Sequence, residues 1–214
     1  RGKLRSEGHR AGVENIRKIV RCFASHQINF VTLFAFSTEN WNRPKAEVEI
    51  LMDLLAEAID SQTYPLHDEG VRIKHIGRLD TLSVELQDAI TRSIDLTQHN
   101  DNITLTVAFN YGGRTEIIDA VRAIVNAGLS ATEISEDVFQ QYLYTKGLPD
   151  VDLIIRTAGE MRLSNFLLWQ SHYAEYFYSK MFWPDFDECE VAKALDAFTK
   201  RQRRYGSAGP QGIV

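Results

Sequence analysis

Short apolar runs rich in β-branched residues alternate along this chain with longer segments in which apolar residues recur at helical spacing. Runs of the first kind are typical of strands buried on both faces of a parallel sheet, with the helices covering those faces. The sequence therefore predicts an α/β protein with a central parallel sheet flanked by helices. The expected strands are 29–36, 71–76, 103–109, 152–155 and one more within the aromatic region 166–178, and the expected helices are 12–27, 45–66, 83–98, 116–127, 136–145 and 187–205.

The length and charge of the chain limit its class. A chain of 214 residues fits one domain and is long enough to bury a core. Its formal net charge of −5 argues against a general nucleic-acid-binding protein, because such proteins are usually basic. No apolar run approaches the roughly 20 residues of a membrane span, and the first residues do not have the composition of a signal peptide. We expect a cytoplasmic protein in which Cys22 and Cys189 are reduced.

Two of the expected strands are followed by polar loops. The first loop, 37–44, reads Ser-Thr-Glu-Asn-Trp-Asn-Arg-Pro, and the second loop, 156–165, reads Arg-Thr-Ala-Gly-Glu-Met-Arg-Leu-Ser-Asn. Ligands of open α/β sheets bind beyond the carboxyl ends of the strands, so we expect both loops at one rim of one sheet. Arg43, Arg156 and Arg162 would face one cleft there, among hydroxyls and amides. These donors suit a ligand with clustered phosphate oxygens.

Each loop also has a purely structural interpretation. Surface arginines are common and often form ordinary salt bridges. Ser37, Thr38 and Pro44 suit a capped turn before a helix. A capped turn does not, however, account for 39–41 and Arg43 together.

Two further features are weaker signals. The basic segment 5–12 runs into the first expected helix, where free backbone N–H groups and the helix dipole favour anions. Many helices begin with charged loops, so this segment alone does not indicate a function. Glu175 lies in an aromatic strand, where it is either an edge residue facing water or an oxygen ligand for a hard cation.

Taken together, the two loops resemble the signature of the cis-prenyltransferases, the undecaprenyl diphosphate synthase family. The resemblance covers nearly the whole chain and implies an enzyme that adds isopentenyl diphosphate to an allylic diphosphate. Arg156, Arg162 and Ser164 would hold the diphosphate of isopentenyl diphosphate, and Leu163 would contribute its backbone. The residues that the resemblance places at the allylic substrate are Arg5, His9, Ser37, Thr38, Glu39, Trp41 and Arg43.

The resemblance also implies one catalytic residue and one metal ligand. Asn40 would lie beside the carbon that loses a proton. Because a neutral amide is a poor base, we expect Asn40 to orient groups while the proton leaves with the diphosphate. Glu175 would be a ligand of Mg²⁺, the implied cofactor.

Other implications concern the product and the assembly. Helices and sheet would enclose an apolar tunnel for the growing chain, and a long polyprenyl product implies peripheral contact with a membrane. The family resemblance further implies a homodimer in which 204–206, an Arg-Tyr-Gly element, reaches a neighbouring active site. The residues that suit either the tunnel wall or the core are Ala35, Leu51, Leu55, Ile103, Leu105 and Phe109.

One part of the family pattern is not among the 214 residues. The pattern opens with a strand and an Asp-Gly-Asn loop, whose aspartate handles magnesium and the allylic diphosphate. The spacing to Arg5 and His9 places this segment before Arg1. We therefore expect 1–206 to be a single cis-prenyltransferase domain without its N-terminal strand and catalytic aspartate, followed by a flexible tail, 207–214.

The predicted function is that of a cis-prenyltransferase. It would condense isopentenyl diphosphate with an allylic diphosphate, expected to be farnesyl diphosphate, into a long-chain Z-polyprenyl diphosphate. One alternative is a non-catalytic regulatory subunit of a heteromeric prenyltransferase, and another is an unrelated phosphate-binding α/β domain. A regulatory subunit would be expected to have lost several substrate contacts, whereas an unrelated domain would not need both loops.

Overall fold

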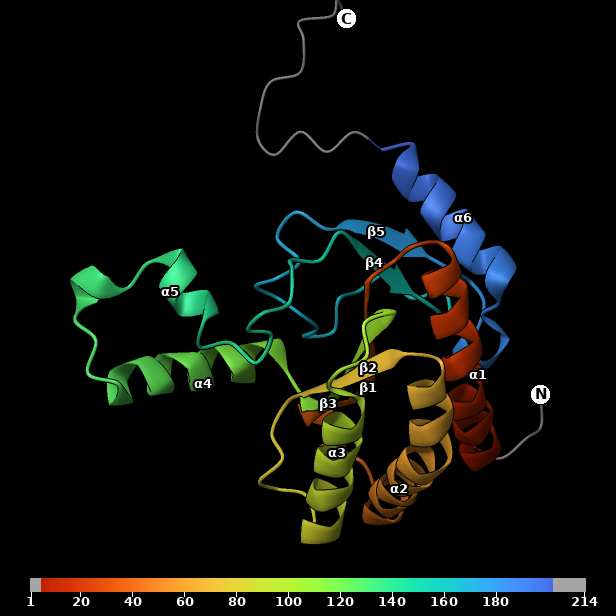
Figure 1. Ribbon diagram of the computed structural model, residues 1–214, viewed down its shortest axis with the longest axis horizontal. Helices are drawn as coiled ribbons and strands as arrows, with labels where there is room; N and C mark the ends of the chain where they lie inside the picture. The colour runs from red at the N-terminus through yellow and green to blue at the C-terminus, as the bar shows by residue number, and fades with distance from the viewer. Residues whose placement is uncertain (1–4, 202–214) are drawn as a thin grey trace, which may run out of the picture.

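The computed structural model describes residues 5–201 as helices packed around parallel strands (Figure 1). The α/β class predicted from the sequence is confirmed. The helices are α1 (Arg5–Ser25), α2 (Lys45–Asp68), α3 (Val84–Thr97), α4 (Gly113–Asn126), α5 (Glu136–Gln140) and α6 (Glu188–Thr199), with short 3-10 turns η1 (Thr38–Asn42), η2 (Ala131–Glu133) and η3 (Trp183–Asp185). The strands are β1 (Phe30–Ser37), β2 (Val71–Ile76), β3 (Ile103–Tyr111), β4 (Leu153–Arg156) and β5 (Glu175–Tyr178).

The strands form two parallel sheets, where the sequence analysis expected one. The larger sheet has the order β1-β3-β2, and β4 pairs only with β5 among the described strands. The two loops therefore follow strands of different sheets. Along one edge each, β1 and β4 have no strand partner within 5–201, and both strands line the same cavity. The two sheets thus border the same cavity. Side-chain contacts connect them rather than a continuous hydrogen-bond ladder.

Strand β3 lies at the centre of the core. Eight of its nine residues are buried, with Val107 intermediate. Near the start of the strand, Leu105 packs in a cluster with Ile19 and Val20 of α1. Near its end and on the same face, Phe109 packs with Leu86 and neighbouring residues of α2 and α3, whereas Ala108 on the opposite face packs in a cluster with Leu167. A strand covered on both faces needs apolar residues without alternation, and the sequence of β3 fits this requirement.

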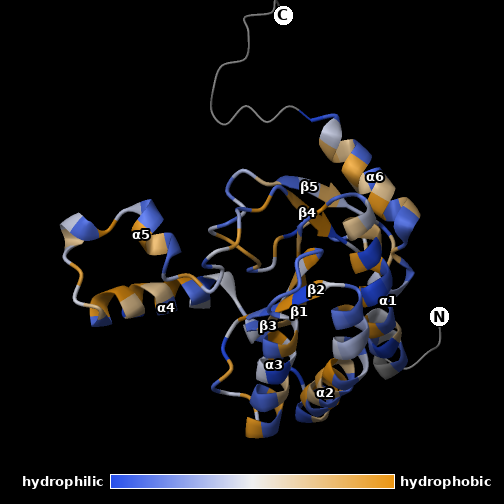
Figure 2. Ribbon diagram, viewed as in Figure 1, coloured by the Kyte–Doolittle hydropathy of each residue, from blue (hydrophilic) through white to orange (hydrophobic). Residues whose placement is uncertain are grey.

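The helices are amphipathic. Figure 2 shows hydrophobic and hydrophilic residues on different sides of α2, α3 and α4. Such a distribution stabilises a helix mainly through packing of its apolar face against the core, as in α2 and α3, whereas Ile118, Val121 and Val125 of α4 are exposed. Within the described residues, no helix is long and apolar enough to cross a membrane.

Helix α1 starts earlier than the sequence analysis expected. It begins at Arg5 rather than at Gly12, so the basic segment 5–12 is helical and does not approach a helix as a loop. Trp183 packs against this helix, and its Nε1 donates to the Gly12 carbonyl at 2.8 Å. A Cβ at Gly12 would lie 3.0 Å from the Trp183 ring, so the glycine permits this close packing. Tertiary packing thus overrides the low helix propensity of glycine.

The other boundary errors are local. Helix α2 continues through Pro65 to Asp68 instead of ending near residue 66, which is possible because Pro65 lies in the last turn and disturbs few helical hydrogen bonds. Helix α5 ends at Gln140 instead of residue 145, and α6 ends at Thr199 instead of residue 205. These differences do not change the order of the elements.

The turn between β3 and α4 brings the polar loops together. Asn110 adopts the left-handed region with φ 51°, and its side chain donates to the Arg78 carbonyl at 2.8 Å and to Thr81 Oγ1 at 2.7 Å. At Gly112, a Cβ would lie 2.5 Å from Thr38 Oγ1 and 2.8 Å from Asn165 Nδ2. Both polar loops therefore approach the backbone at Gly112 more closely than any side chain would permit.

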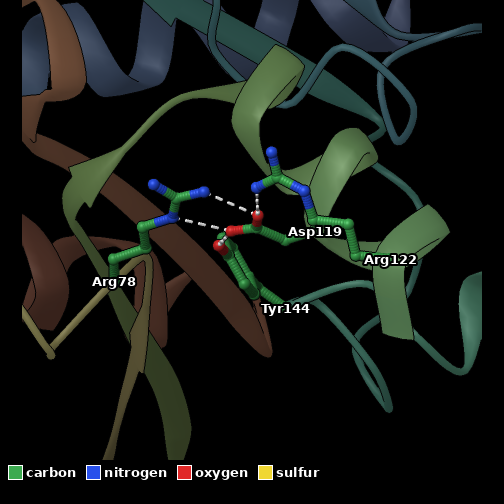
Figure 3. A network of polar contacts seen from close by, with 4 residues as sticks. All are labelled: Arg78, Asp119, Arg122 and Tyr144. Carbon is green, nitrogen blue, oxygen red and sulfur yellow. Dashed lines mark hydrogen bonds and ion pairs between the residues drawn. The ribbon is translucent and has the colours of Figure 1, made fainter. Parts of the chain in front are cut away.

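A polar network fastens α4 to the segment that follows β2 (Figure 3). Asp119 on α4 accepts hydrogen bonds from Arg78 Nε at 2.7 Å and Nη2 at 2.6 Å, and also from the Tyr144 hydroxyl. Arg122 lies 3.2 Å from the same carboxylate. The bidentate Arg78 pairing lowers the pKa of Asp119, and burial only partly opposes this effect.

We expect Asp119→Asn to lower the free energy of unfolding at pH 7 by about 1–2 kcal/mol, because Arg78 and Arg122 lose their anionic partner. The pKa of Asp119 is depressed in the folded state, so its contribution is full above the unfolded pKa of about 4 and is lost as the pH falls through the folded pKa. Urea denaturation at pH 7 and pH 3 should show the difference between wild type and variant shrinking at pH 3.

The control for this variant is Asp196→Asn, since the pair between Asp196 and Lys200 is largely exposed, with 61% and 72% of the side chains accessible. Its effect should stay within about 0.5 kcal/mol. A difference for Asp119→Asn that is equally large at pH 3 would contradict the assigned ion pair.

We expect Gly112→Ala to destabilise the protein by about 1–3 kcal/mol, because the added Cβ must displace Thr38 and Asn165. The backbone at Gly112, with φ −155°, suits any residue, so the effect would be steric. Thermal unfolding should show a lower melting temperature. Gly8→Ala is the matched control, because nothing lies within 4 Å of its Cβ and alanine favours the helix; equal melting temperatures for the two variants would contradict the close approach.

Candidate active site

The second loop leaves β4 at Arg156 and is fixed by the segment after β5. The N–H of Ala158 donates to the Met181 carbonyl at 2.7 Å, and the N–H of Gly159 donates to the Ser179 carbonyl at 2.8 Å. Ala158, Gly159 and Ser164 all adopt positive φ angles, between 54° and 70°. Such angles are costly for residues other than glycine and persist only where surrounding contacts hold them. The loop therefore has a defined path.

Glu160 joins the two arginines of the second loop. Its Oε2 lies 2.5 Å from Arg156 Nη2, and its Oε1 lies 2.5 Å from Arg162 Nη2. The hydrogen bond from Arg156 is the main reason that the pKa of Glu160 is lowered, and Arg162 adds to the effect. Ser164 is exposed in the same loop, and Leu163 is partly buried. The loop thus gathers the four residues predicted to bind isopentenyl diphosphate, together with a carboxylate that the prediction had not assigned.

The first loop folds as a 3-10 turn after β1. The Ser37 N–H donates to Asn40 Oδ1 at 3.0 Å, so the amide oxygen of Asn40 shapes its own loop. Trp41 is 39% exposed and donates from Nε1 to Asn110 Oδ1 at 2.7 Å. Arg43 pairs with Glu47 one helical turn later, at 3.0 Å. The loop is therefore built on contacts with the β3–α4 turn and with α2.

Asn165 connects the second loop to the first loop and to α4. Its Nδ2 donates to Glu39 Oε1 at 2.7 Å, and its Oδ1 accepts from the Arg114 N–H at 2.9 Å. Its carbonyl also accepts from the Gly113 N–H at 2.7 Å. Partial burial raises the pKa of Glu39, but hydrogen bonds from its own backbone, from Asn165 and from Ser37 and Thr38 lower it more, so the carboxylate stays ionised. These contacts hold both loops at one place although their strands belong to different sheets.

A cavity of about 1030 Å³ lies beside the second loop. Residues of α1, β1, α2, β3 and β4 line it, mostly with apolar side chains, while Arg156, Glu160 and Arg162 line its polar part. Of the residues proposed for a tunnel wall or core, Ile103 does not line the cavity, whereas Ala35, Leu51, Leu55, Leu105 and Phe109 do, the last two from within the buried core. Such a cavity can hold a ligand with a charged head and a long apolar body.

The structure does not bring all the predicted site residues to this cavity. His9 lines it from α1, whereas 37–43 do not line it; Trp41 of this loop packs edge-on against Phe36, which does line the cavity, and Glu39 accepts a hydrogen bond from Asn165. The side chain of Arg5 and the element 204–206 lie outside the described residues.

Glu175 lies away from the arginine loop. It begins β5 and pairs in register with Leu153, whereas Arg156 pairs with Tyr178 at the other end of the strand. Its Oε2 lies 2.5 Å from Arg201 Nη1. Among residues 5–201, no three His, Cys, Asp or Glu side chains gather in a way that could hold a metal ion. The protein groups described do not by themselves form a magnesium site.

Glu160, Asn110, Gly112 and Asn165 were not predicted as site residues. Residues 110–113 read Asn-Tyr-Gly-Gly between an expected strand and an expected helix, and the asparagine and glycines of this turn are the signal that the sequence offers. Trp41, the loop partner of Asn110, lies 69 residues away from it, and Glu39, the loop partner of Asn165, lies 126 residues away, so no local pattern could reveal these contacts.

Comparison with known proteins gives consistent relatives. The family model described as "Putative undecaprenyl diphosphate synthase" matches residues 1–206. The ditrans,polycis-undecaprenyl-diphosphate synthase ((2E,6E)-farnesyl-diphosphate specific) of Photorhabdus laumondii is 46% identical over 214 residues, which are 98% of this chain and 84% of that protein. The isoprenyl transferase of Clostridium perfringens is 47% identical over 210 residues, which are 96% of this chain and 83% of that protein.

Solved structures agree with these relatives. The structure of lavandulyl diphosphate synthase from Lavandula x intermedia in complex with dimethylallyl diphosphate has a TM-score of 0.91 and 36% identity, covering 96% of this chain and 91% of that one. A probable undecaprenyl diphosphate synthase from Campylobacter jejuni has a TM-score of 0.84 and 34% identity, covering 97% of this chain and 95% of that one. With its two polar loops held together beside an apolar cavity, the chain belongs to the undecaprenyl diphosphate synthase family of cis-prenyltransferases.

Proposed function

We propose that this protein condenses isopentenyl diphosphate with an allylic diphosphate, farnesyl diphosphate, to form a long-chain Z-polyprenyl diphosphate. The observation that carries the proposal is the pair Arg156 and Arg162 at the edge of an apolar cavity of about 1030 Å³. The activity named for the Photorhabdus laumondii relative supports both the reaction and farnesyl diphosphate as the allylic substrate. A substrate of this kind combines the two properties of the site, a polyanionic head and an apolar body.

The chemistry defines what the residues must do. The bond between C1 and oxygen of the allylic diphosphate breaks and diphosphate leaves, while the terminal alkene carbon of isopentenyl diphosphate forms a bond to C1. A proton is then lost from the isopentenyl unit, and this loss sets the cis double bond. Cationic groups that bind the departing diphosphate lower the barrier, because negative charge grows on its oxygens.

The second loop suits the isopentenyl diphosphate. Arg156 and Arg162 present planar guanidinium groups that can bind two phosphate oxygens each, and the Ser164 hydroxyl adds a neutral donor. Leu163 lines the cavity in the same loop. With its charged head fixed here, the apolar part of the substrate would point into the cavity.

The first loop and α1 suit the allylic substrate. We assign Arg43 and His9 to its diphosphate, together with Arg5, whose side chain lies outside the described residues. Trp41 would shape the entrance to the apolar site, and Ser37, Thr38 and Glu39 would form the surrounding loop. Because the Asn40 amide oxygen accepts from the Ser37 N–H, we assign Asn40 a role in orienting groups rather than in removing the proton.

Mg²⁺ is the cofactor that we propose. Mg²⁺ is commonly bound through one or two carboxylates together with substrate phosphates, and when bound here it would neutralise diphosphate charge. Glu175 is the carboxylate assigned to it, and binding would require Glu175 to leave Arg201. Activity should therefore disappear when EDTA replaces Mg²⁺ in the assay.

A non-catalytic regulatory subunit is the second candidate. Asn40, Arg43, Arg156, Arg162 and Ser164 are all present, which favours the enzyme. We also propose a homodimer with peripheral contact to membranes during product release. Light scattering would test the mass of the dimer, and vesicle flotation with product present would test the membrane contact.

The test of the proposed function is incorporation of labelled isopentenyl diphosphate with farnesyl diphosphate and Mg²⁺. The 214 residues do not contain the family's Asp-Gly-Asn segment, so the assay compares this chain with a version extended by that segment and its strand from a relative. A butanol-extractable polyprenyl product from the extended chain would support the enzyme. Binding of isopentenyl diphosphate without product from either chain would instead support the regulatory subunit.

We expect Arg162→Ala to raise the KM for isopentenyl diphosphate at least tenfold and to change the KM for farnesyl diphosphate much less, because one charge-assisted contact is lost. Arg43→Ala should instead raise the KM for farnesyl diphosphate at least tenfold and change the KM for isopentenyl diphosphate much less. Steady-state kinetics on the active chain would measure both constants. Arg122→Ala, an exposed arginine on α4, is the matched control and should leave both KM values unchanged; equal effects of all three variants would refute the assignment of the loops.

A further inference from the structure

The two arginines assigned to isopentenyl diphosphate already bind an anion in this structure. Each oxygen of Glu160 lies 2.5 Å from a different guanidinium group, one of Arg156 and one of Arg162. A carboxylate matches the guanidinium donors in the same planar way as two oxygens of a phosphate group. Glu160 thus occupies donors that the substrate would need.

Glu160 is able to leave this position. Its side chain is 34% exposed, and Arg162 is 61% exposed, so neither is locked by burial. The backbone on its N-terminal side is fixed through Ala158 and Gly159, which bond to the segment after β5. The carboxylate therefore stays close to the arginines even when its side chain turns away.

We propose that Glu160 is a resident competitor for the diphosphate-binding arginines, which weakens the binding of isopentenyl diphosphate and speeds the departure of its diphosphate after each condensation. This inference rests on the proposed function. It assigns to Glu160 a role in setting the affinity for isopentenyl diphosphate, which Glu160 exerts through Arg156 and Arg162.

The reaction explains why such a competitor is useful. In each condensation the allylic C1–O bond breaks, diphosphate leaves, the new C–C bond forms and one proton is lost. The lengthened chain then carries the diphosphate that entered with isopentenyl diphosphate, still bound to the second loop. Before another isopentenyl diphosphate can bind, this group must leave Arg156 and Arg162. An attached carboxylate can take over both arginines as the diphosphate departs.

The first test is equilibrium binding of isopentenyl diphosphate without an allylic substrate, so that no reaction occurs. Glu160→Gln keeps the size of the side chain and removes its charge. We expect the variant to bind about fivefold more tightly, which is the order of magnitude of a partly exposed ion pair. Glu160→Asp retains the charge and should stay closer to wild type.

A matched control removes a carboxylate elsewhere. Glu57 accepts two hydrogen bonds from Arg10, at 3.0 and 3.1 Å, and neither residue lines the cavity. Glu57→Gln should leave the affinity unchanged. Far-ultraviolet circular dichroism and melting temperatures would establish that all variants are folded.

The second test measures turnover in the active, extended chain. Glu160→Gln should lower the KM for isopentenyl diphosphate together with kcat, and should shift the products toward shorter chains, because release from the arginines becomes slower. A residue that only shapes the loop would raise the KM when changed.

The outcomes separate the two proposals. Tighter binding by Glu160→Gln, with slower turnover, supports the competitor. Equal or weaker binding by Glu160→Gln, while wild type binds isopentenyl diphosphate, overturns the competitor and leaves the proposed function intact. If wild type binds neither isopentenyl diphosphate nor inorganic pyrophosphate, the proposed function fails and the competitor with it.

Discussion

The parallel pairing of β3 with both β1 and β2 is the constraint on which the larger sheet and its surroundings depend. One face of β3 packs against α1 near Leu105 and against α2 and α3 near Phe109, so the register of the strand fixes all three helices on that face. The next-to-last residue of the strand is Asn110, whose backbone is left-handed and whose side chain accepts a hydrogen bond from Trp41. A buried strand thereby sets the position of a polar loop 69 residues away in the sequence.

Asn165 performs the complementary task between the sheets. Strands β4 and β1 share no hydrogen-bond ladder within the described residues. The distance between the two loops is therefore set by the side-chain and backbone contacts of Asn165 and of the turn around Gly112 and Gly113. Hydrogen bonds to the charged Glu39 are stronger than neutral ones, and partial burial reduces competition from water. The site is therefore assembled by polar contacts on a frame that hydrophobic burial provides.

Most elements of the fold could be predicted from the sequence, because buried parallel strands and amphipathic helices have distinct periods. Strand 71–76 was predicted with the observed bounds, and β3 continues only two residues beyond its prediction. The start of α1 was placed too late, because glycine has a low helix propensity and yet Gly8 and Gly12 both lie within the helix, where Gly12 packs against Trp183, 171 residues away in the sequence. The division into two sheets likewise depends on pairing between distant segments. In the site, the residues of the second loop were recognised from their types and order, whereas Glu160 is defined by two ion pairs that are visible only in three dimensions.

The three arginines of the two loops share one physical property: each has a carboxylate partner in this structure, Glu47 for Arg43 and Glu160 for Arg156 and Arg162. Arginines close together repel one another, and interposed carboxylates relieve that repulsion while keeping the guanidinium groups oriented. A diphosphate carries more charge and more acceptor oxygens than a single carboxylate, so it can displace Glu160. The net binding free energy is then only the difference between the interaction of the arginines with diphosphate and their interaction with Glu160. Arginines that already pair with a carboxylate of the same protein therefore bind diphosphate weakly enough for one diphosphate to be exchanged for the next. An enzyme that adds units repeatedly needs that balance, because every diphosphate it binds at this loop must also leave it.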